Sequence, residues 1–410
     1  MLIPEGQSRA FPLFSYIRGG LSRTSALYSR RPAYPQHQSI KPRRIITATS
    51  RQHNLKDQVK AIMTTNLPQN IRAVLQPDPN TDNLILTKTA LPTPEEGDTE
   101  EHLVQIKATS PCLAELTWER NFPDAFTSER KRERVPGTEG AGIIITAPAG
   151  SPFKPNDEVY FRNTAERRGC LSDYTLIHKK SLAHKPKTQN WFEAAVTPLS
   201  SLTAYQALFE HGLLDPRAIV TQGGDTKARE ANSKVRVLIT AASGSVGSWA
   251  VQLASAAGAG AIVAVSGPGK LDEVRKAGAT DVLDYTKQSV AGWTAEDPSL
   301  RECDMALDCV GGNSLAACWT AVRDGGVLLS VSDSPDRVKP ASLLSKKLSK
   351  ATWFLVEPRG SDLAEITKIV DAGLGKPWID SVVEFEDFQK AFDKVETRHA
   401  NGKVVIKVTA

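Results

Sequence analysis

The pattern of hydrophobic and polar positions changes near Phe192, and each part of the chain predicts a different kind of sheet. Before Phe192, short apolar or alternating segments predict strands at 71–75 and 84–88 (a hairpin), at 102–108, at 143–145 and within 155–161. Many short strands between turn residues are typical of a β-rich, barrel-like unit. After Phe192, helical patterns alternate with apolar runs at 237–240, 261–265, 282–285, 305–309 and 327–331. This alternation predicts a parallel, doubly wound sheet, and the fold class is therefore α/β.

Three polar segments interrupt these patterns. They are 91–99, which carries prolines, 119–133, which is highly charged, and 222–234, which carries glycines. We expect each of them to be a surface loop.

The first strand of the second part leads into a turn of small residues. The run Val-Leu-Ile-Thr at 237–240 is followed by Ala-Ala-Ser-Gly-Ser-Val-Gly at 241–247, and a helical pattern begins at Ser248. A strand, a tight turn and a helix start allow close approach of the backbone to a pyrophosphate, whose charge the helix N-terminus stabilises. We therefore expect a dinucleotide to bind at Ser243, Gly244, Ser245, Val246 and Gly247. Ala242 stands where the usual fingerprint has its first glycine.

The end of the second strand indicates which dinucleotide binds. An NAD-binding unit usually places Asp or Glu there, to bind the ribose 2′-hydroxyl. This chain has Ser266-Gly-Pro-Gly-Lys270 instead, and no carboxylate before Asp272. A hydroxyl and a lysine suit a 2′-phosphate, so the sequence favours NADPH over NADH. The alternative is that Lys270 is a solvated lysine at a helix start.

The net charge is distributed unevenly. The whole chain carries +5, but residues 1–60 hold eleven Lys and Arg against two acids, and the rest holds 40 against 44. The leader is therefore +9 and the body −4, and the body has no reason to bind nucleic acid. Hydrophobic content of 40% and charged content of 24% are ordinary for a globular chain of this length. No apolar run approaches the about 18 residues that span a membrane.

The N-terminal segment resembles a targeting signal. Residues 6–56 contain no Asp or Glu, many Ser and Thr, and eight arginines. This composition is typical of a mitochondrial presequence, so residues 1–60 predict a matrix protein. The alternatives are a disordered basic tail and a wrong start codon, and a start at Met63 would give a cytoplasmic protein.

Several motifs resemble those of the medium-chain dehydrogenase/reductase superfamily, in the same order. They are VPGTEGAG at 135–142, PNDEVY at 155–160, GCLSDY at 169–174, LTAYQAL at 202–208, DCVGG at 308–312 and GKVV at 402–405. The resemblance covers nearly all of residues 70–410. It implies a GroES-like β-barrel catalytic domain at 61–200 with 376–410, and a Rossmann NADPH-binding domain with a doubly wound parallel sheet at 201–375.

Within that superfamily, the chain resembles the zinc-independent quinone oxidoreductase and enoyl reductase branch. The Gly-His-Glu motif of the zinc enzymes falls on Gly137-Thr138-Glu139, which lacks the histidine. Cys112 stands about where those enzymes have a ligand cysteine, but one thiol cannot hold a catalytic zinc alone. Five cysteines without a C-x-x-C pair also argue against a disulfide framework or a structural zinc cluster. We therefore expect no metal, and we expect Cys112 to be a packed or pocket-lining thiol.

The resemblance also implies further cofactor contacts. Ser266 and Lys270 correspond to 2′-phosphate ligands, Tyr285 to a tyrosine near the adenosine half, and Lys403 to a late lysine close to the cofactor. Val310 and Val331 correspond to strand ends that line the cofactor groove. The alternative for Tyr285, Val310 and Val331 is simple packing.

Without a metal, the expected reaction is hydride transfer from NADPH to a small quinone or an α,β-unsaturated carbonyl, such as an enone or enoyl thioester. Hydrogen-bond donors would stabilise the enolate or hydroquinone anion that forms. The catalytic residue is unassigned, because the loop around Cys112 has no tyrosine. The pocket candidates are Cys112, Glu115, Trp118 and Phe354, although Glu115 and Trp118 are equally explained as a surface acid and a loop-packing residue.

Two other functions remain open. One is a trans-acting enoyl reductase of secondary metabolism, against which the leader argues. The other is a non-catalytic NADPH-binding interaction protein. Relatives commonly dimerise through the edge of the Rossmann sheet, which implies a homodimer through the strand at 327–331.

Overall fold

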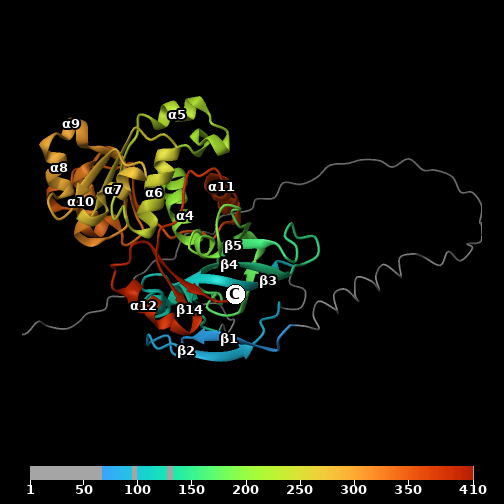
Figure 1. Cartoon of the computed structure of the whole chain (residues 1–410). Helices are drawn as coiled ribbons and strands as arrows, with labels where there is room; N and C mark the ends of the chain where they lie inside the picture. The colour runs from blue at the N-terminus through green and yellow to red at the C-terminus, as the bar shows by residue number, and fades with distance from the viewer. Residues whose placement is uncertain (1–66, 95–98, 127–132, 410) are drawn as a thin grey trace, which may run out of the picture. The chain divides into compact units, whose positions relative to one another are not determined.

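Short apolar strands build two large sheets in the part of the chain that the computed structural model describes, which is residues 67–94, 99–126 and 133–409 (Figure 1). The predicted leader at 1–60 and Met63 lie outside the described residues. A separate hairpin pairs β1 (Asn70–Leu75) with β2 (Ile85–Ala90) antiparallel, as the sequence predicts.

The first sheet has seven strands and a mainly antiparallel order. Its path is β14–β15–β3–β4–β5–β7, and β6 also pairs with β3. The strands are β3 (Glu101–Ser110), β4 (Glu139–Thr146), β5 (Glu158–Arg162), β6 (Tyr174–His178), β7 (Leu182–His184), β14 (Ile379–Glu384) and β15 (Lys403–Lys407). The C-terminal strands therefore return to the sheet that the N-terminal strands begin, which gives the GroES-like barrel that the resemblance implies.

The second sheet is parallel and doubly wound. Its order is β10–β9–β8–β11–β12–β13, so the order reverses at β8 and β11. The strands are β8 (Arg236–Ile239), β9 (Ala261–Ser266), β10 (Asp281–Asp284), β11 (Cys303–Asp308), β12 (Val322–Ser330) and β13 (Lys350–Trp353). The first five lie where the apolar runs predict strands, and the sequence did not predict β13.

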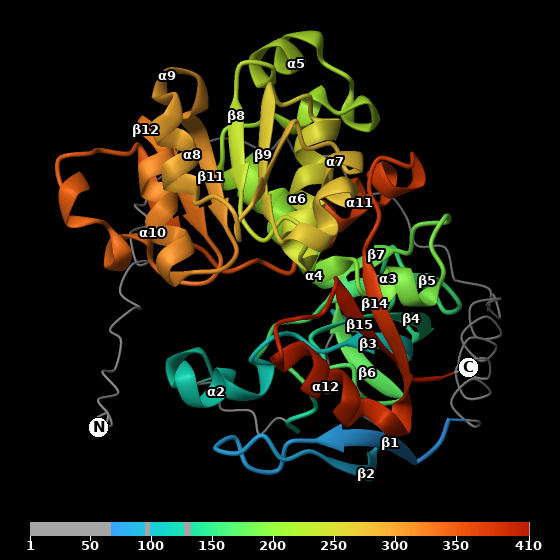
Figure 2. The ribbon, with the colours of Figure 1, turned by 60° about the vertical axis from the view of Figure 1, so that its left-hand side comes forward.

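Helices cover both faces of this parallel sheet (Figure 2). Side chains alternate along a strand, so Val237 and Ile239 pack with α4, α6 and α11, whereas Leu238 packs with α8 and α10 on the other face. The bounds of these helices are α4 (Pro198–Tyr205), α6 (Ser245–Ala256), α8 (Val290–Glu296), α10 (Gly312–Ala321) and α11 (Gly360–Asp371). The remaining ones are α2 (Trp118–Asn121), α3 (Trp191–Ala195), α5 (Thr226–Asn232), α7 (Leu271–Lys276), α9 (Pro298–Arg301) and α12 (Phe388–Glu396).

Two of the predicted loops contain helix. In the segment 222–234, Asp225 accepts hydrogen bonds from the amides of Lys227 and Ala228 and starts α5, so the loop prediction is wrong there. In the segment 119–133, the described residues belong mainly to α2 and to a 3₁₀ turn (Pro123–Phe126). The described residues of the third segment, 91–94 and 99, form neither helix nor strand.

The strand proposed as a dimer edge is not an edge. β12 is hydrogen-bonded to β11 on one side and to β13 on the other. The prediction that the strand at 327–331 pairs with a second copy is therefore wrong, because β13 covers it. None of the helices in the described part of the chain has the length and apolar character that crossing a bilayer requires.

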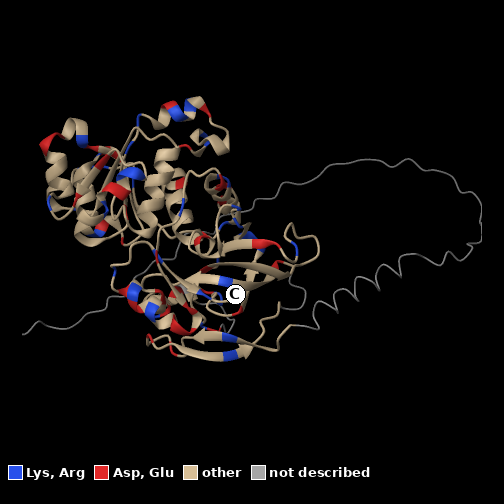
Figure 3. Cartoon of the chain, in the orientation of Figure 1, with Lys and Arg blue, Asp and Glu red and all other residues tan. Residues whose placement is uncertain are grey.

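Lys and Arg positions are interspersed with Asp and Glu over the described chain (Figure 3). Many of them form ion pairs at the surface, such as Arg120 with Asp82 and Arg323 with Asp304.

Candidate active site

The turn after β8 is shaped for close approach to a ligand. Ala241 adopts a left-handed conformation with φ of 46°, which turns the chain sharply after the strand. A Cβ atom on Gly247 would lie 2.2 Å from the carbonyl oxygen of Ala241, so only glycine fits where α6 packs on the turn. No side chain caps the start of α6 at Gly244. The first amides of this helix therefore remain available to an anion, and the turn fits the pyrophosphate of a nicotinamide dinucleotide.

Ser243 of this turn meets the end of β9. The hydroxyls of Ser243 and Ser266 are 2.9 Å apart and hydrogen-bonded. Tyr285 follows β10 and lies beside Gly267, because a Cβ on Gly267 would be 3.5 Å from the tyrosine oxygen. The Tyr285 side chain is 65% exposed, so it is not a packing residue of the core. These contacts bring three of the predicted cofactor residues, Ser243, Ser266 and Tyr285, into one neighbourhood.

Lys270 lies just before α7 and already has an acidic partner. Its ammonium nitrogen is 2.9 Å from both carboxylate oxygens of Glu273. Val331 directly follows β12, and Val310 lies two residues after the end of β11. Val310 is 49% exposed, whereas Val331 packs at the margin of the core. Both valines thus stand at strand ends, as the sequence predicts.

Asp308 organises the point where the strand order reverses, and the sequence did not single it out. This fully buried carboxylate accepts hydrogen bonds from the hydroxyls of Thr240 (2.8 Å) and Ser314 (2.7 Å), and from the amide of Gly311 (2.6 Å). It therefore ties the end of β8 to the end of β11. In open α/β sheets, ligands bind in the crevice at this switch point, so Asp308 holds the cofactor turn in shape. The sequence signal was its place at the start of the DCVGG motif at 308–312, but the motif did not show its partners.

A second group of charged residues lies in the first sheet. Lys403 is 2.7 Å from Glu139, donates to the carbonyl of Pro111 (3.3 Å), and is 7% exposed. The other oxygen of Glu139 accepts from the amide of Leu199 (2.8 Å). Burial alone lowers the pKa of Lys403, but Glu139, Cys112 and Glu115 outweigh it and raise the pKa above its ordinary value. The structure thus places Lys403 with the pocket candidates Cys112 and Glu115.

Arg162 belongs to the same group. It stands opposite Glu139 in the β4–β5 register and is 3% exposed. One guanidinium nitrogen donates to the carbonyl of Asn163, and Nε has no hydrogen-bond partner among the described residues. Burial lowers the pKa of Arg162, and the nearby Cys112, Glu139 and Glu115 oppose that shift.

Glu115 fastens the loop that carries Cys112. Its two carboxylate oxygens accept from the amides of Cys112 (3.0 Å) and Gly137 (2.7 Å). Burial raises the pKa of Glu115, and the two amides oppose the shift. Burial also raises the pKa of the Cys112 thiol to about 11, so the thiol is neutral at neutral pH. Glu115 is therefore a positioning residue rather than a surface acid.

Three comparisons place this arrangement among known proteins. A profile of the family described as zinc-binding dehydrogenase matches residues 277–406. The "Probable zinc-binding oxidoreductase, mitochondrial" of Arthroderma benhamiae is 42% identical over 345 residues, which cover 84% of this chain and 98% of that protein. The chain belongs to the medium-chain dehydrogenase/reductase superfamily. It is accordingly an oxidoreductase.

More distant members of the superfamily agree in sequence and in fold. The "NAD(P)H oxidoreductase RTN4IP1, mitochondrial" of Danio rerio is 32% identical over 276 residues, covering 62% of this chain and 67% of that protein. The "Chloroplast envelope quinone oxidoreductase homolog" of Arabidopsis thaliana is 27% identical over 320 residues, covering 77% and 92%. The crystal structure of an alcohol dehydrogenase superfamily protein from Novosphingobium aromaticivorans superposes with a TM-score of 0.66 and 25% identity, covering 83% and 100%.

Relatives are named for zinc, yet the donor set of this oxidoreductase does not fit a zinc ion. Thr138 stands where the zinc enzymes have a histidine, and the carboxylates of Glu139 and Glu115 are engaged by Lys403 and by backbone amides. Only the Cys112 thiol remains as a donor, and catalytic zinc needs three protein ligands. In the described part of the chain, no three His, Cys, Asp or Glu side chains are grouped so as to hold a metal.

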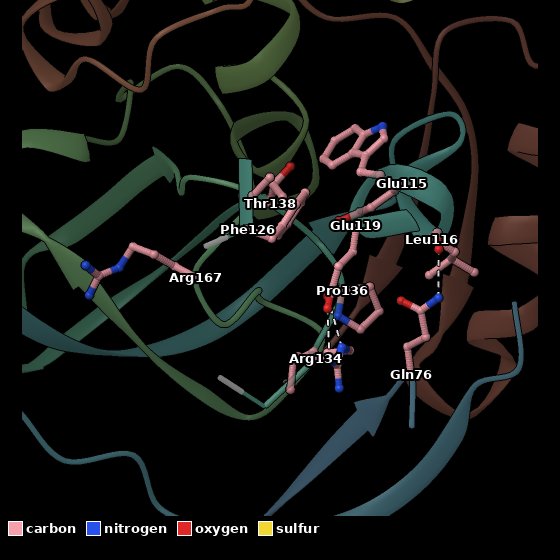
Figure 4. A pocket seen from close by; sticks show the side chains of 12 residues that line it. Gln76, Glu115, Leu116, Glu119, Phe126, Arg134, Pro136, Thr138 and Arg167 are labelled. Carbon is pink, nitrogen blue, oxygen red and sulfur yellow. Dashed lines mark hydrogen bonds and ion pairs between the residues drawn. The ribbon is translucent and has the colours of Figure 1, made fainter. Parts of the chain in front are cut away.

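A cavity lies beside this group (Figure 4). Glu115 and Trp118 line it with Thr138 and Phe126, and its wall includes Arg134, which forms two hydrogen bonds with Glu119 at 2.8 and 2.9 Å. Its volume of about 30 Å³ admits a carbonyl oxygen or one or two water molecules, but no whole ring.

Thr138 is the unexpected member of this cavity. It is 5% exposed, and its hydroxyl has no hydrogen-bond partner among the described residues. Phe354, in contrast, does not line the cavity. Its ring is 8% exposed and packs on the ring of His211 with a centroid distance of 4.6 Å.

Proposed function

We propose that the protein is an NADPH-dependent reductase that delivers a hydride to a quinone or an α,β-unsaturated carbonyl without a metal ion. The observation that carries the proposal is a turn shaped for a dinucleotide in a chain whose Cys112, Glu115 and Glu139 side chains do not fit a zinc ion. The names of the relatives, which include an NAD(P)H oxidoreductase and a quinone oxidoreductase homolog, support it.

At the cofactor end, the residues of this chain bind NADPH and orient it. When bound, NADPH supplies the hydride. In this proposal the amides of Ser245, Val246 and Gly247 hold the pyrophosphate, and Ser266 and Lys270 hold the 2′-phosphate. No carboxylate takes the place of the acid that binds a ribose 2′-hydroxyl, because β9 ends in Ser266.

Tyr285, Val310 and Val331 complete the proposed cofactor groove. Half-exposed apolar side chains at strand ends suit the flat faces of a bound ring, and Val310 is of this kind. Lys403 is not assigned a contact with the cofactor, because its ammonium is already paired with Glu139. In this proposal it keeps Glu139 and the loop of Cys112 in place beside the reacting groups.

At the acceptor end, we assign the hydrogen bond to Thr138. Negative charge develops on the acceptor oxygen as the hydride arrives, and a preorganised donor in a water-poor site stabilises it. The Thr138 hydroxyl is buried and has no described partner, so it can donate without losing another bond. Trp118 also lines this cavity, which admits the carbonyl oxygen of the acceptor but not its ring. The proton that completes the reduction comes from solvent.

The full-length chain tests the proposal directly. NADPH oxidation is measured with 1,2- and 1,4-quinones, simple enones and enoyl thioesters, and NADH serves as the control. Turnover with NADPH that is lost in Lys270→Glu supports the reductase and ranks the acceptors. Tight NADPH binding with no turnover on any acceptor contradicts it and favours a non-catalytic binding protein.

The proposed place of action is the mitochondrial matrix. The arginine-rich, acid-free composition of residues 6–56 supports it, as do the names of two relatives that contain the word mitochondrial. Full-length and Met63-start forms fused to a fluorescent protein distinguish a matrix from a cytoplasmic location.

A further inference from the structure

We infer that Glu273 competes with the 2′-phosphate of the cofactor for Lys270, and so limits the preference of the enzyme for NADPH over NADH. The inference rests on the proposed function, because it concerns the same 2′-phosphate site. It starts from the two contacts of 2.9 Å between the Lys270 ammonium and both oxygens of Glu273.

The backbone builds this contact locally. Lys270 ends the 3₁₀ turn Pro268–Lys270, and Glu273 lies in the first turn of α7 three residues later. Residues three apart lie on one face of a helical turn, so the carboxylate is held beside the ammonium before any cofactor arrives. The side chain of Lys270 is only 27% exposed, and that of Glu273 is 49% exposed. The lysine that the 2′-phosphate needs is therefore already engaged.

A bound 2′-phosphate meets two unfavourable effects at this position. Lys270 must give up or share its contacts with Glu273, and the phosphate, with a charge of about −1.5 to −2, is repelled by the carboxylate. Asp380 on β14 also lies within electrostatic range of Lys270 and adds to the acidic surroundings. NADH meets neither effect, because it carries no 2′-phosphate. The Glu273 carboxylate therefore weakens the binding of NADPH but not that of NADH, and so lowers the preference for NADPH.

Glu273→Gln removes the charge and keeps the size of the side chain. The same helix turn supplies a matched control, since Asp272 is an acid that pairs with Arg275 at 2.9 Å and not with Lys270. Asp272→Asn therefore changes the net charge equally without releasing Lys270.

The experiment measures dissociation constants of NADPH and NADH for the full-length protein, by calorimetry or cofactor fluorescence at fixed ionic strength. Glu273→Gln should tighten the binding of NADPH by about two- to fivefold, the range of a single exposed ion pair, and leave the dissociation constant of NADH unchanged. Asp272→Asn should leave the ratio of the two constants unchanged. Because the effect is electrostatic, the gain should shrink as salt is raised.

A double-mutant cycle with Lys270→Gln isolates the competition. If Glu273→Gln tightens the binding of NADPH as much in the Lys270→Gln background as in the wild type, Glu273 does not act by competing for Lys270. If Glu273→Gln leaves NADPH binding unchanged while the wild type still prefers NADPH, the inference fails and the cofactor assignment stands. If the wild type binds both cofactors equally and Lys270→Gln affects neither, the cofactor assignment itself fails.

Discussion

Thr138 is the residue on which the proposed chemistry depends most directly. The residue lines the cavity, and its hydroxyl is buried and has no described partner. Replacing it by the isosteric Val should lower kcat by about 10²-fold, the loss seen when one oxyanion donor is removed. The dissociation constant of NADPH should not change, because Thr138 is not part of the cofactor turn.

Thr138→Ser serves as the control for that substitution, since it keeps the hydroxyl and removes only a methyl group. Stopped-flow hydride transfer and cofactor binding are measured on both variants. A Val variant that retains wild-type kcat would remove Thr138 from the mechanism.

The ion pair of Glu139 and Lys403 is predicted to be required for the stability of the folded protein. Glu139→Gln leaves a lysine ammonium that is 7% exposed without its carboxylate, which should lower the free energy of unfolding by about 3 kcal/mol or more. Glu384→Gln is the matched control on neighbouring strands, because its pair with Lys407 is exposed and should contribute about 1 kcal/mol or less. Urea denaturation measures both. Equal effects would mean that the Glu139 pair behaves as a surface pair.

Whether the role of a residue can be predicted from the sequence depends on how far away its contact partners lie along the chain. The cofactor turn was predictable because strand, turn and helix start follow one another within 237–247. The roles of Lys403 and Asp308 were not, because their partners Glu139 and Thr240 lie far away in the sequence and only the fold brings them together. The free hydroxyl of Thr138 is likewise a property of its surroundings, not of the motif.

Among the strands of the parallel sheet, those buried on both faces were the most readily predicted. β8, β9 and β11 each contain a continuous run of three or more apolar residues, as is typical of strands covered by helices on both sides. β13 has the sequence Lys-Ala-Thr-Trp, and its residues are only partly buried, so no apolar run marks it. α5 is almost wholly polar, and only its cap at Asp225 indicates that it is a helix.

The connection between β4 and β5 is predicted to weaken in acid. The fully buried His102 on β3 is 2.7 Å from the hydroxyl of Ser151 in that connection, and its other nitrogen contacts the carbonyl of Glu100. Burial lowers the pKa of His102, and the backbone carbonyls of Glu100 and Ile177 only partly oppose this. The folded protein therefore resists a proton that the unfolded chain accepts below about pH 6.5, and the free energy of unfolding should fall as pH decreases below that value.

His102→Gln should flatten this pH dependence, because it removes the group that titrates. The control is His399→Gln, which changes an exposed histidine near the C-terminus. Unfolding is followed between pH 5 and 8 for each variant. If the pH dependence of the free energy of unfolding is unchanged in His102→Gln but reduced in His399→Gln, His102 is not the group responsible.

At the scale of the whole molecule, the division into domains at 61–200 with 376–410 and at 201–375 stays a prediction, as does the homodimer. The parallel sheet has two edge strands among those described, β10 and β13. β10 begins and ends with the acids Asp281 and Asp284, and charges protect an edge from pairing. β13 carries only one charged residue, Lys350, whose ammonium contacts His211, so β13 is the less protected edge.

We therefore predict that the protein dimerises by pairing the β13 edges of two copies. Trp353 on this edge is 39% exposed and Leu355 beyond it is 65% exposed, so an apolar contact accompanies the strand pairing. Trp353→Glu should convert the dimer to a monomer in analytical ultracentrifugation, because it places two like charges at the contact. Leu300→Glu on α9 changes an equally exposed leucine away from this edge and should leave the dimer intact. A monomeric wild type, or a Trp353→Glu variant that still sediments as a dimer, would show that the β13 edge does not carry the assembly.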